Sequence, residues 1–156
     1  MSGPVVRAAG PSDASLVLRL IHDSFASRSA LVPPSGAGKE TVDSIGAVLA
    51  VGGAGLAVLE DEPAGAVLWQ PRDDSLYLGR LSVLPQFRQR GIAGALVEWV
   101  EAQARRLGKP AVTLGVRVSL PENFELFSRR GFVEISRSAH PGWTEPTMIE
   151  MRKQLV

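Results

Sequence analysis

The chain has 156 residues, of which 45% are hydrophobic and 21% charged, and its formal net charge is +1. This length predicts one domain over residues 1–156, with a substantial buried core, and the small charge gives no reason to expect binding to nucleic acid or a membrane. The chain has no cysteine, which excludes disulfides, thiolate metal ligands and a cysteine nucleophile. With only two histidines, we expect no metal site.

No segment of the sequence suggests export or a membrane span. The N-terminal residues lack the apolar core of a signal peptide. The longest uncharged run, Ile45–Leu59, is interrupted by glycines and is shorter than the roughly 20 residues that cross a bilayer. We therefore expect a cytoplasmic, soluble protein.

The first third of the chain predicts one strand and two helices. Val5–Ala8 should be a short strand, and Ser12 is a suitable N-cap for a helix that runs to about Arg28. A second helix is expected over Thr41–Val51, with its first residue as the N-cap. Between them, Leu31–Glu40 is rich in proline and glycine and is expected to be a loop, either a plain connection or a mobile cover over a substrate cleft.

Three successive strands are then expected to form an antiparallel meander. Gly55–Leu59 and Ala64–Trp69 read as a hairpin, and Leu76–Val83 as the third strand. Within the third strand, the apolar residues change from even to odd positions across Gly79-Arg80. One extra residue in a strand is what a β-bulge produces, so a bulge is predicted there.

The second half predicts a long helix, a buried strand, a short helix and two more strands. The long helix should run from Gly91 to Gly108, and the strand after it over Ala111–Val116. A helical crossover makes the strands on either side of it parallel. The last elements are expected over Pro121–Arg130, Phe132–Arg137 and Met148–Arg152. The predicted fold class is α/β (α+β), with a mixed seven-stranded sheet and about four helices.

The turn between the bulged strand and the long helix has features that suit a phosphate group. The first N–H groups of a helix have no partner within it, and the helix dipole makes that end positive. Gly91 lets a ligand approach the backbone, while Arg88 and Arg90 carry donors that match phosphate oxygens. The alternative is an ordinary turn with two solvated arginines. The residues of the turn are Arg88-Gln89-Arg90-Gly91-Ile92-Ala93.

These six residues match the R/Q-x-x-G-x-G/A signature of the GNAT superfamily of N-acetyltransferases, and the order of elements resembles that fold over nearly the whole chain. Residues 120–132 and 140–147 also resemble segments of a bacterial subgroup. The resemblance implies a GNAT fold in which the parallel fourth and fifth strands splay apart. It further implies acetyl-CoA as the co-substrate, with its pantetheine arm lying between those strands.

The resemblance also implies roles for particular residues. The backbone N–H groups from Arg88 to Ala93 would hold the pyrophosphate, and the N–H of Val83 would polarise the thioester carbonyl. Asn123 lies where the family often has an asparagine near the thiol, although a helix-end cap is the alternative. The implied catalytic residues are Val83 and Asn123. The implied cofactor-binding residues are Leu81, Ser82, Val83, Arg88, Gln89, Arg90, Gly91, Ile92, Ala93, Asn123 and Phe127.

Phe127 departs from the family pattern. Many members have a tyrosine there that protonates the departing thiolate, and phenylalanine has no proton to give. Because an acetyl-cysteine relay is impossible without cysteine, we expect a primary amine, on a small molecule or a protein, to attack acetyl-CoA directly in a ternary complex. The alternative, which Phe127 favours, is a non-catalytic acyl-CoA-binding or regulatory module.

Two features are left open by the sequence. The base that takes the amine proton is unidentified, and the weak candidates are Glu60, Glu122, Glu125 and His140. A homodimer formed through a sheet edge is plausible for the fold.

Overall fold

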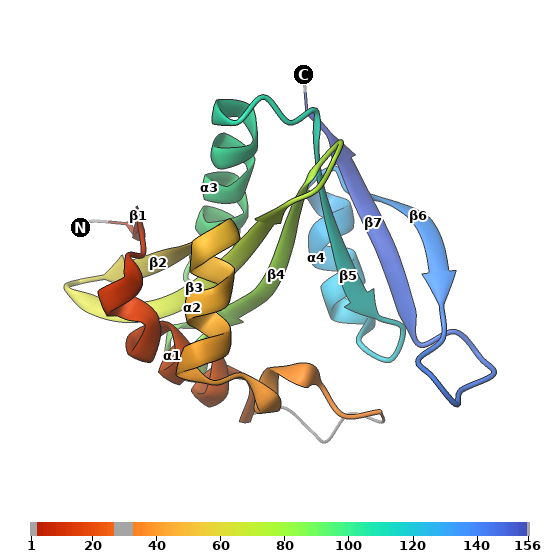
Figure 1. The fold of residues 1–156 in the computed structure, drawn as a ribbon, viewed down its shortest axis with the longest axis horizontal. Coiled ribbons are helices and arrows are strands. Elements are labelled where there is room, and N and C mark those ends of the chain that lie inside the picture. Colours follow the sequence, from red (N-terminus) through yellow and green to blue (C-terminus); the bar gives the residue numbers. More distant parts are fainter. Residues whose placement is uncertain (1–2, 27–32, 156) are drawn as a thin grey trace.

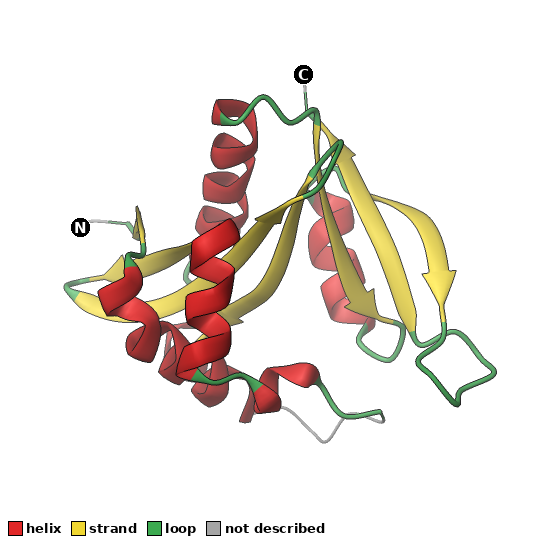
Figure 2. Ribbon diagram, viewed as in Figure 1, coloured by secondary structure: helices red, strands yellow, loops and turns green. Residues whose placement is uncertain are grey.

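The computed structural model describes residues 3–26 and 33–155. One seven-stranded sheet, in the order β1-β2-β3-β4-β5-β7-β6, carries helices on both faces (Figures 1 and 2). The strands are β1 (Val5–Ala8), β2 (Gly53–Leu59), β3 (Glu62–Pro71), β4 (Leu76–Val83), β5 (Ala111–Arg117), β6 (Val133–Ser138) and β7 (Met148–Gln154). The α-helices are α1 (Ala14–Ala26), α2 (Val42–Val51), α3 (Ile92–Arg106) and α4 (Pro121–Arg129). The predicted fold class and its mixed sheet are confirmed.

The start of α1 differs from the prediction. Ser12 is not its N-cap but lies inside a 3-10 turn, Pro11–Asp13, that leads into the helix. The Asp13 carboxylate accepts a hydrogen bond from the Gly10 N–H at 2.8 Å and so closes this turn. An acidic side chain three residues into the turn replaces the expected serine cap. The predicted end of the helix, near Arg28, lies outside the described residues.

The start of α2 agrees with the prediction. The Thr41 hydroxyl accepts the N–H of Ser44 at 3.1 Å, and the Ser44 hydroxyl accepts the N–H of Thr41 at 2.8 Å. This reciprocal capping satisfies two N–H groups that the helix leaves unpaired. Of the predicted loop over residues 31–40, the described part contains a second 3-10 turn, Gly36–Lys39.

The predicted bulge in β4 is confirmed. Leu68 of β3 pairs with Gly79 and Ala66 pairs with Ser82, so two residues of β4 lie opposite one residue of β3. Arg80, the first of these two, has a φ of +51°, in the left-handed region that a non-glycine residue seldom adopts. The bulge turns the following residues of β4 relative to the sheet.

The two parallel strands separate soon after they meet. β4 and β5 pair only at Leu76 with Val112 and at Tyr77 with Thr113, and every other strand pair in the sheet is antiparallel. Figure 1 shows the two strands diverging from this shared end. The bulge begins at Arg80, three residues after the last pair, so the sheet opens into a V at that point.

The helices cover the two faces of the sheet near this opening. In Figure 1, α1 and α2 lie on one face, while α3 and α4 lie on the other. α3 packs an apolar stripe on the sheet, with Leu96, Val97 and Val100 fully buried. One charged residue on this helix, Glu101, is also buried and lies 2.9 Å from the Lys153 ammonium of β7.

Two kinds of feature are absent from the part of the chain that the structure describes. No helix among residues 3–26 and 33–155 is long and apolar enough to cross a membrane. The same residues contain no group of three or more His, Cys, Asp or Glu side chains placed to hold a metal ion.

Candidate active site

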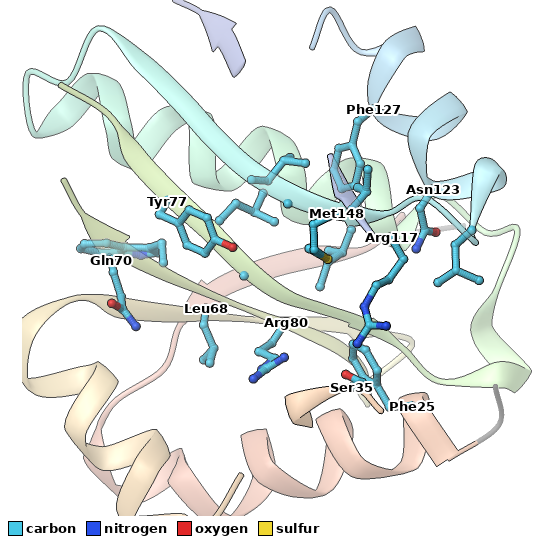
Figure 3. A pocket seen from close by; sticks show the side chains of 18 of the residues that line it. Phe25, Ser35, Leu68, Gln70, Tyr77, Arg80, Arg117, Asn123, Phe127 and Met148 are labelled. Carbon is cyan, nitrogen blue, oxygen red and sulfur yellow. The ribbon is translucent and has the colours of Figure 1, made fainter. Parts of the chain in front are cut away.

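A cleft of about 380 Å³ opens where β4 and β5 diverge (Figure 3). Residues from both strands, from α1 and α2, from the segment before α2 and from α4 line it, so it gathers segments that are far apart in the sequence. Its lining surface is about half polar and half apolar. Its charged or titratable side chains are Glu40, Tyr77, Arg80 and Arg117.

Two arginines connect the splayed strands to the segment before α2. Arg117 of β5 donates hydrogen bonds to the backbone carbonyls of Pro33 and Pro34. Burial lowers the pKa of its guanidinium. The Nε of Arg80, at the bulge of β4, lies 3.6 Å from the Glu40 carboxylate. The described part of this segment, residues 33–40, therefore spans the mouth of the V and forms one wall of the cleft.

Tyr77 enters the cleft from β4. Its ring is covered by Arg72, whose Cζ lies 4.0 Å from the ring centroid. Figure 3 shows its hydroxyl pointing into the cleft, on the side where Arg80 and Met148 lie. No local pattern marks Tyr77 as a cleft residue, because a tyrosine in a strand usually packs against neighbouring side chains.

The two arginines of the turn after β4 make contacts within the protein. The Arg88 side chain donates to the backbone carbonyls of Val83, at 3.2 Å, and Ser24, at 3.1 Å. Arg90 lies 3.6 Å from the Glu60 carboxylate. Arg88 therefore holds the turn against the end of α1. Both guanidinium groups also contribute positive charge near the turn.

The backbone of the turn forms a concave row of N–H groups. Gln89 has a φ of +62° and Gly91 a φ of +83°, so the chain alternates between left-handed and other conformations. In the described chain, the N–H groups of Gln89, Arg90 and Gly91 donate no hydrogen bond, and those of Ile92 and Ala93 begin α3. A Cβ added at Gly91 would meet nothing within 4 Å. Unpaired N–H groups in such an arrangement have the geometry that suits an anion.

The N–H of Val83 already has a partner. Leu84 donates to the carbonyl of Ala64 in β3 at 2.9 Å, so the N–H of the preceding residue faces away from β3, towards the V. There it donates to the Ser24 hydroxyl of α1 at 3.2 Å. A ligand that pairs with Val83 must therefore displace this hydroxyl. The neighbouring residue Ser82 is buried and donates its hydroxyl to the Arg80 carbonyl.

Asn123 and Phe127 reach the cleft from one face of α4, one turn apart. The Asn123 side chain makes no hydrogen bond among the described residues and the helix has no side-chain cap, so the alternative of a helix-end cap is wrong. Phe127 is buried and packs edge-on against Phe132, with 5.5 Å between the ring centroids. Both predicted residues therefore line the same cleft as Leu81.

None of the four base candidates from the sequence lines the cleft. Glu60 pairs with Arg90, and Glu125 with Arg129 at 3.5 Å. His140 hydrogen-bonds to Thr147. The cleft instead holds Glu40, Tyr77, Arg80 and Arg117, which come from three separate parts of the chain and which no local pattern brings together.

Residues 40–132, more than half of the chain, match the acetyltransferase (GNAT) family. The chain therefore belongs to this family. A search of curated protein sequences finds no significant match.

Solved structures share the fold at low sequence identity. The ribosomal-protein-S18-alanine N-acetyltransferase from Escherichia coli is 17% identical, with a TM-score of 0.78 over 97% of this chain and 93% of that one. The PaiA N-acetyltransferase from Thermoplasma acidophilum, in complex with coenzyme A, is 15% identical, with a TM-score of 0.78 over 99% of this chain and 100% of that one. Ard1 from Thermoplasma volcanium is 16% identical, with a TM-score of 0.77 over 99% of both chains.

The predicted class of protein, an acetyl-CoA-dependent N-acetyltransferase, is confirmed by the family match. Nothing in these comparisons supports the alternative of a non-catalytic module. At such identities the solved structures establish the fold alone.

Proposed function

We propose that this protein binds acetyl-CoA in the V between β4 and β5 and transfers the acetyl group directly to a primary amine in a ternary complex. The observation that carries this proposal is the continuity of the site. The row of N–H groups after β4 lies next to the opened strand edge, and the cleft begins on the same strand, at Leu81. An extended ligand with a diphosphate at one end fits this arrangement.

On the basis of this continuity we propose a position for each part of the cofactor. The N–H groups from Arg88 to Ala93 hold the diphosphate, and the edge of β4 from Leu81 to Val83 pairs with the pantetheine arm. Asn123 and Phe127 form the wall beside the acyl end. Binding of the arm replaces the hydrogen bond between Ser24 and Val83, which exchanges one hydroxyl partner for a carbonyl partner at little net cost.

Direct transfer needs three events at the thioester. The neutral amine attacks the carbonyl carbon, and a C–N bond forms while the carbonyl π electrons move to oxygen. A backbone N–H at the opened edge of β4 stabilises this developing oxyanion. The carbonyl then re-forms as the C–S bond breaks, the nitrogen loses a proton and the sulfur gains one. Phe127 cannot supply the last proton.

The acceptor is a primary amine on a small molecule or a protein. The E. coli enzyme named above acts on an alanine of a ribosomal protein, and the amine of such an alanine is one candidate acceptor here.

Release of CoA can be followed with a thiol reagent, because the chain has no cysteine of its own to react with it. We expect acetyl-CoA to raise the melting temperature, and thiol release with at least one of three probes: a peptide with an N-terminal alanine, a lysine-containing peptide, and spermidine. A melting temperature that acetyl-CoA leaves unchanged would contradict binding. A rise in melting temperature without thiol release from any probe would favour the non-catalytic module.

We also propose that β6 pairs with a second copy of this chain. β6 is an edge strand on which every residue is exposed, including Val133 at 62% and Ile135 at 49%. The outer edge of β6 presents backbone groups that the strand of a second copy can pair with, and its exposed apolar side chains favour such pairing. Light scattering should show a dimer that Ile135→Lys converts to a monomer. A monomer for the unmodified chain would refute the pairing.

A further inference from the structure

We propose that the hydroxyl of Tyr77 carries the proton from the attacking amine to the departing sulfur. This inference rests on the proposed function, since it concerns the acetyl transfer in the same cleft. Tyr77 lies on β4, across the opening from Phe127, and supplies the proton that a phenylalanine cannot donate.

The position of Tyr77 places its hydroxyl at the closed end of the V. Tyr77 is the last residue of β4 to pair with β5, through Thr113, before the two strands separate. Its hydroxyl lies 3.5 Å from where a Cβ would be at Gly115, two residues further along β5. The Met148 methyl lies 3.0 Å from the same position, so the hydroxyl and this methyl together border the cleft where Gly115 has no side chain.

The ring is held from outside while its hydroxyl stays available. Arg72 covers the ring at 4.0 Å and is itself 3.5 Å from the Glu150 carboxylate. The hydroxyl makes no hydrogen bond among residues 3–26 and 33–155. An oriented ring with an uncommitted hydroxyl in a cleft is prepared to bond a ligand rather than the protein.

The other polar groups of the cleft are less suited to this transfer. Arg80 and Arg117 have no site that can accept a proton. The Glu40 carboxylate is engaged by Arg80 at 3.6 Å and by the Ser44 hydroxyl at 3.1 Å. Tyr77 therefore combines a transferable proton, a free acceptor lone pair and a place at the closed end of the cleft.

The transfer balances without an external base. The acceptor enters as the neutral amine, and its nitrogen becomes positive as the C–N bond forms. One N–H bond breaks as that proton moves to the Tyr77 oxygen, and the phenolic O–H bond breaks as its own proton moves to sulfur. The C–S bond breaks with its electron pair on sulfur, and the products are an amide, free CoA and neutral Tyr77. Nitrogen and sulfur share one carbon in the tetrahedral intermediate, so a single hydroxyl can reach both.

The first test uses the fact that Tyr77 is the only tyrosine in the chain. Growth on 3-fluorotyrosine labels this position alone, and its ¹⁹F resonance reports the surroundings of the ring without any substitution. We expect acetyl-CoA to shift this resonance, and desulfo-CoA, which lacks the sulfur and the acetyl group, to shift it less. An unchanged resonance in protein whose melting temperature acetyl-CoA raises would overturn the proposal.

The second test removes the hydroxyl. We expect Tyr77→Phe to lower kcat about a hundredfold, within the usual range for a general acid–base group, and to leave the Kd for acetyl-CoA within about twofold. Thr113→Val is the matched control, because it removes a buried hydroxyl from the paired residue of β5, outside the cleft.

The possible outcomes separate this inference from the proposed function. A wild-type kcat in Tyr77→Phe, or an effect on the acceptor KM alone, would overturn the role of Tyr77 while leaving the acetyltransferase proposal intact. An equal loss of kcat in Thr113→Val would also overturn it, because the effect would then be structural. Failure of the wild-type protein to bind or use acetyl-CoA would instead refute the proposed function.

Discussion

Gly91→Asp tests the anion site most directly. Gly91 is the N-cap of α3, has a φ of +83°, and has open space where a side chain would project. A carboxylate there points at the proposed diphosphate. Two unit charges about 5 Å apart at an effective dielectric constant of about 20 repel by about 3 kcal/mol. We therefore expect the Kd for CoA to rise by about a hundredfold or more.

The matched control is Gly91→Asn, which has the same shape and no charge. Asparagine and aspartate both tolerate the left-handed conformation, so the backbone strain is similar in the two variants and cancels in their comparison. Isothermal titration with CoA at low salt gives the two Kd values, and added salt should reduce their difference. Equal Kd values for the two variants would refute a diphosphate beside Gly91.

Three further predictions concern other parts of the structure. Phe127→Tyr brings a hydroxyl to the cleft from α4. We expect kcat to rise only about fivefold, because the CoA thiolate is already a good leaving group. An unchanged kcat with unchanged acetyl-CoA affinity would mean that this hydroxyl does not reach the sulfur. Lys153→Met leaves the buried Glu101 carboxylate without its partner and should lower the free energy of unfolding by about 3 kcal/mol in urea titrations. The double variant Glu101→Leu/Lys153→Met should recover much of this loss. No recovery in the double variant would mean that the loss does not come from an unpaired buried charge. The hydrogen bond from Arg7 and that from the backbone of residue 10 lower the pKa of Asp13, so its stabilising contribution is present above the unfolded pKa of about 3.9 and is lost as pH falls through the folded pKa. Asp13→Asn should therefore lower the melting temperature at pH 7 but have little effect near pH 2, and an equal effect at both values would contradict this linkage.

Local sequence signals predicted the elements that depend on local physics. The change of apolar parity across Gly79-Arg80 indicated the bulge, because side chains alternate along a strand and one extra residue reverses the alternation. Thr41 indicated the start of α2, because its hydroxyl needs only a nearby N–H. The Ser12 prediction failed for a related reason: Asp13 competes for the same N-terminal region and closes a 3-10 turn instead.

The sequence by itself thus determined the order of elements, the turn proposed to bind the diphosphate and the family resemblance, because each depends on residues close together in the chain. Only the tertiary structure decided what surrounds the reacting atoms. It brought Glu40, Tyr77 and Arg117 into one cleft and placed the Ser24 hydroxyl on the N–H of Val83. These contacts join residues separated by tens of positions, and their geometry follows from the bulge and the divergence of β4 from β5, which sets where each side chain points.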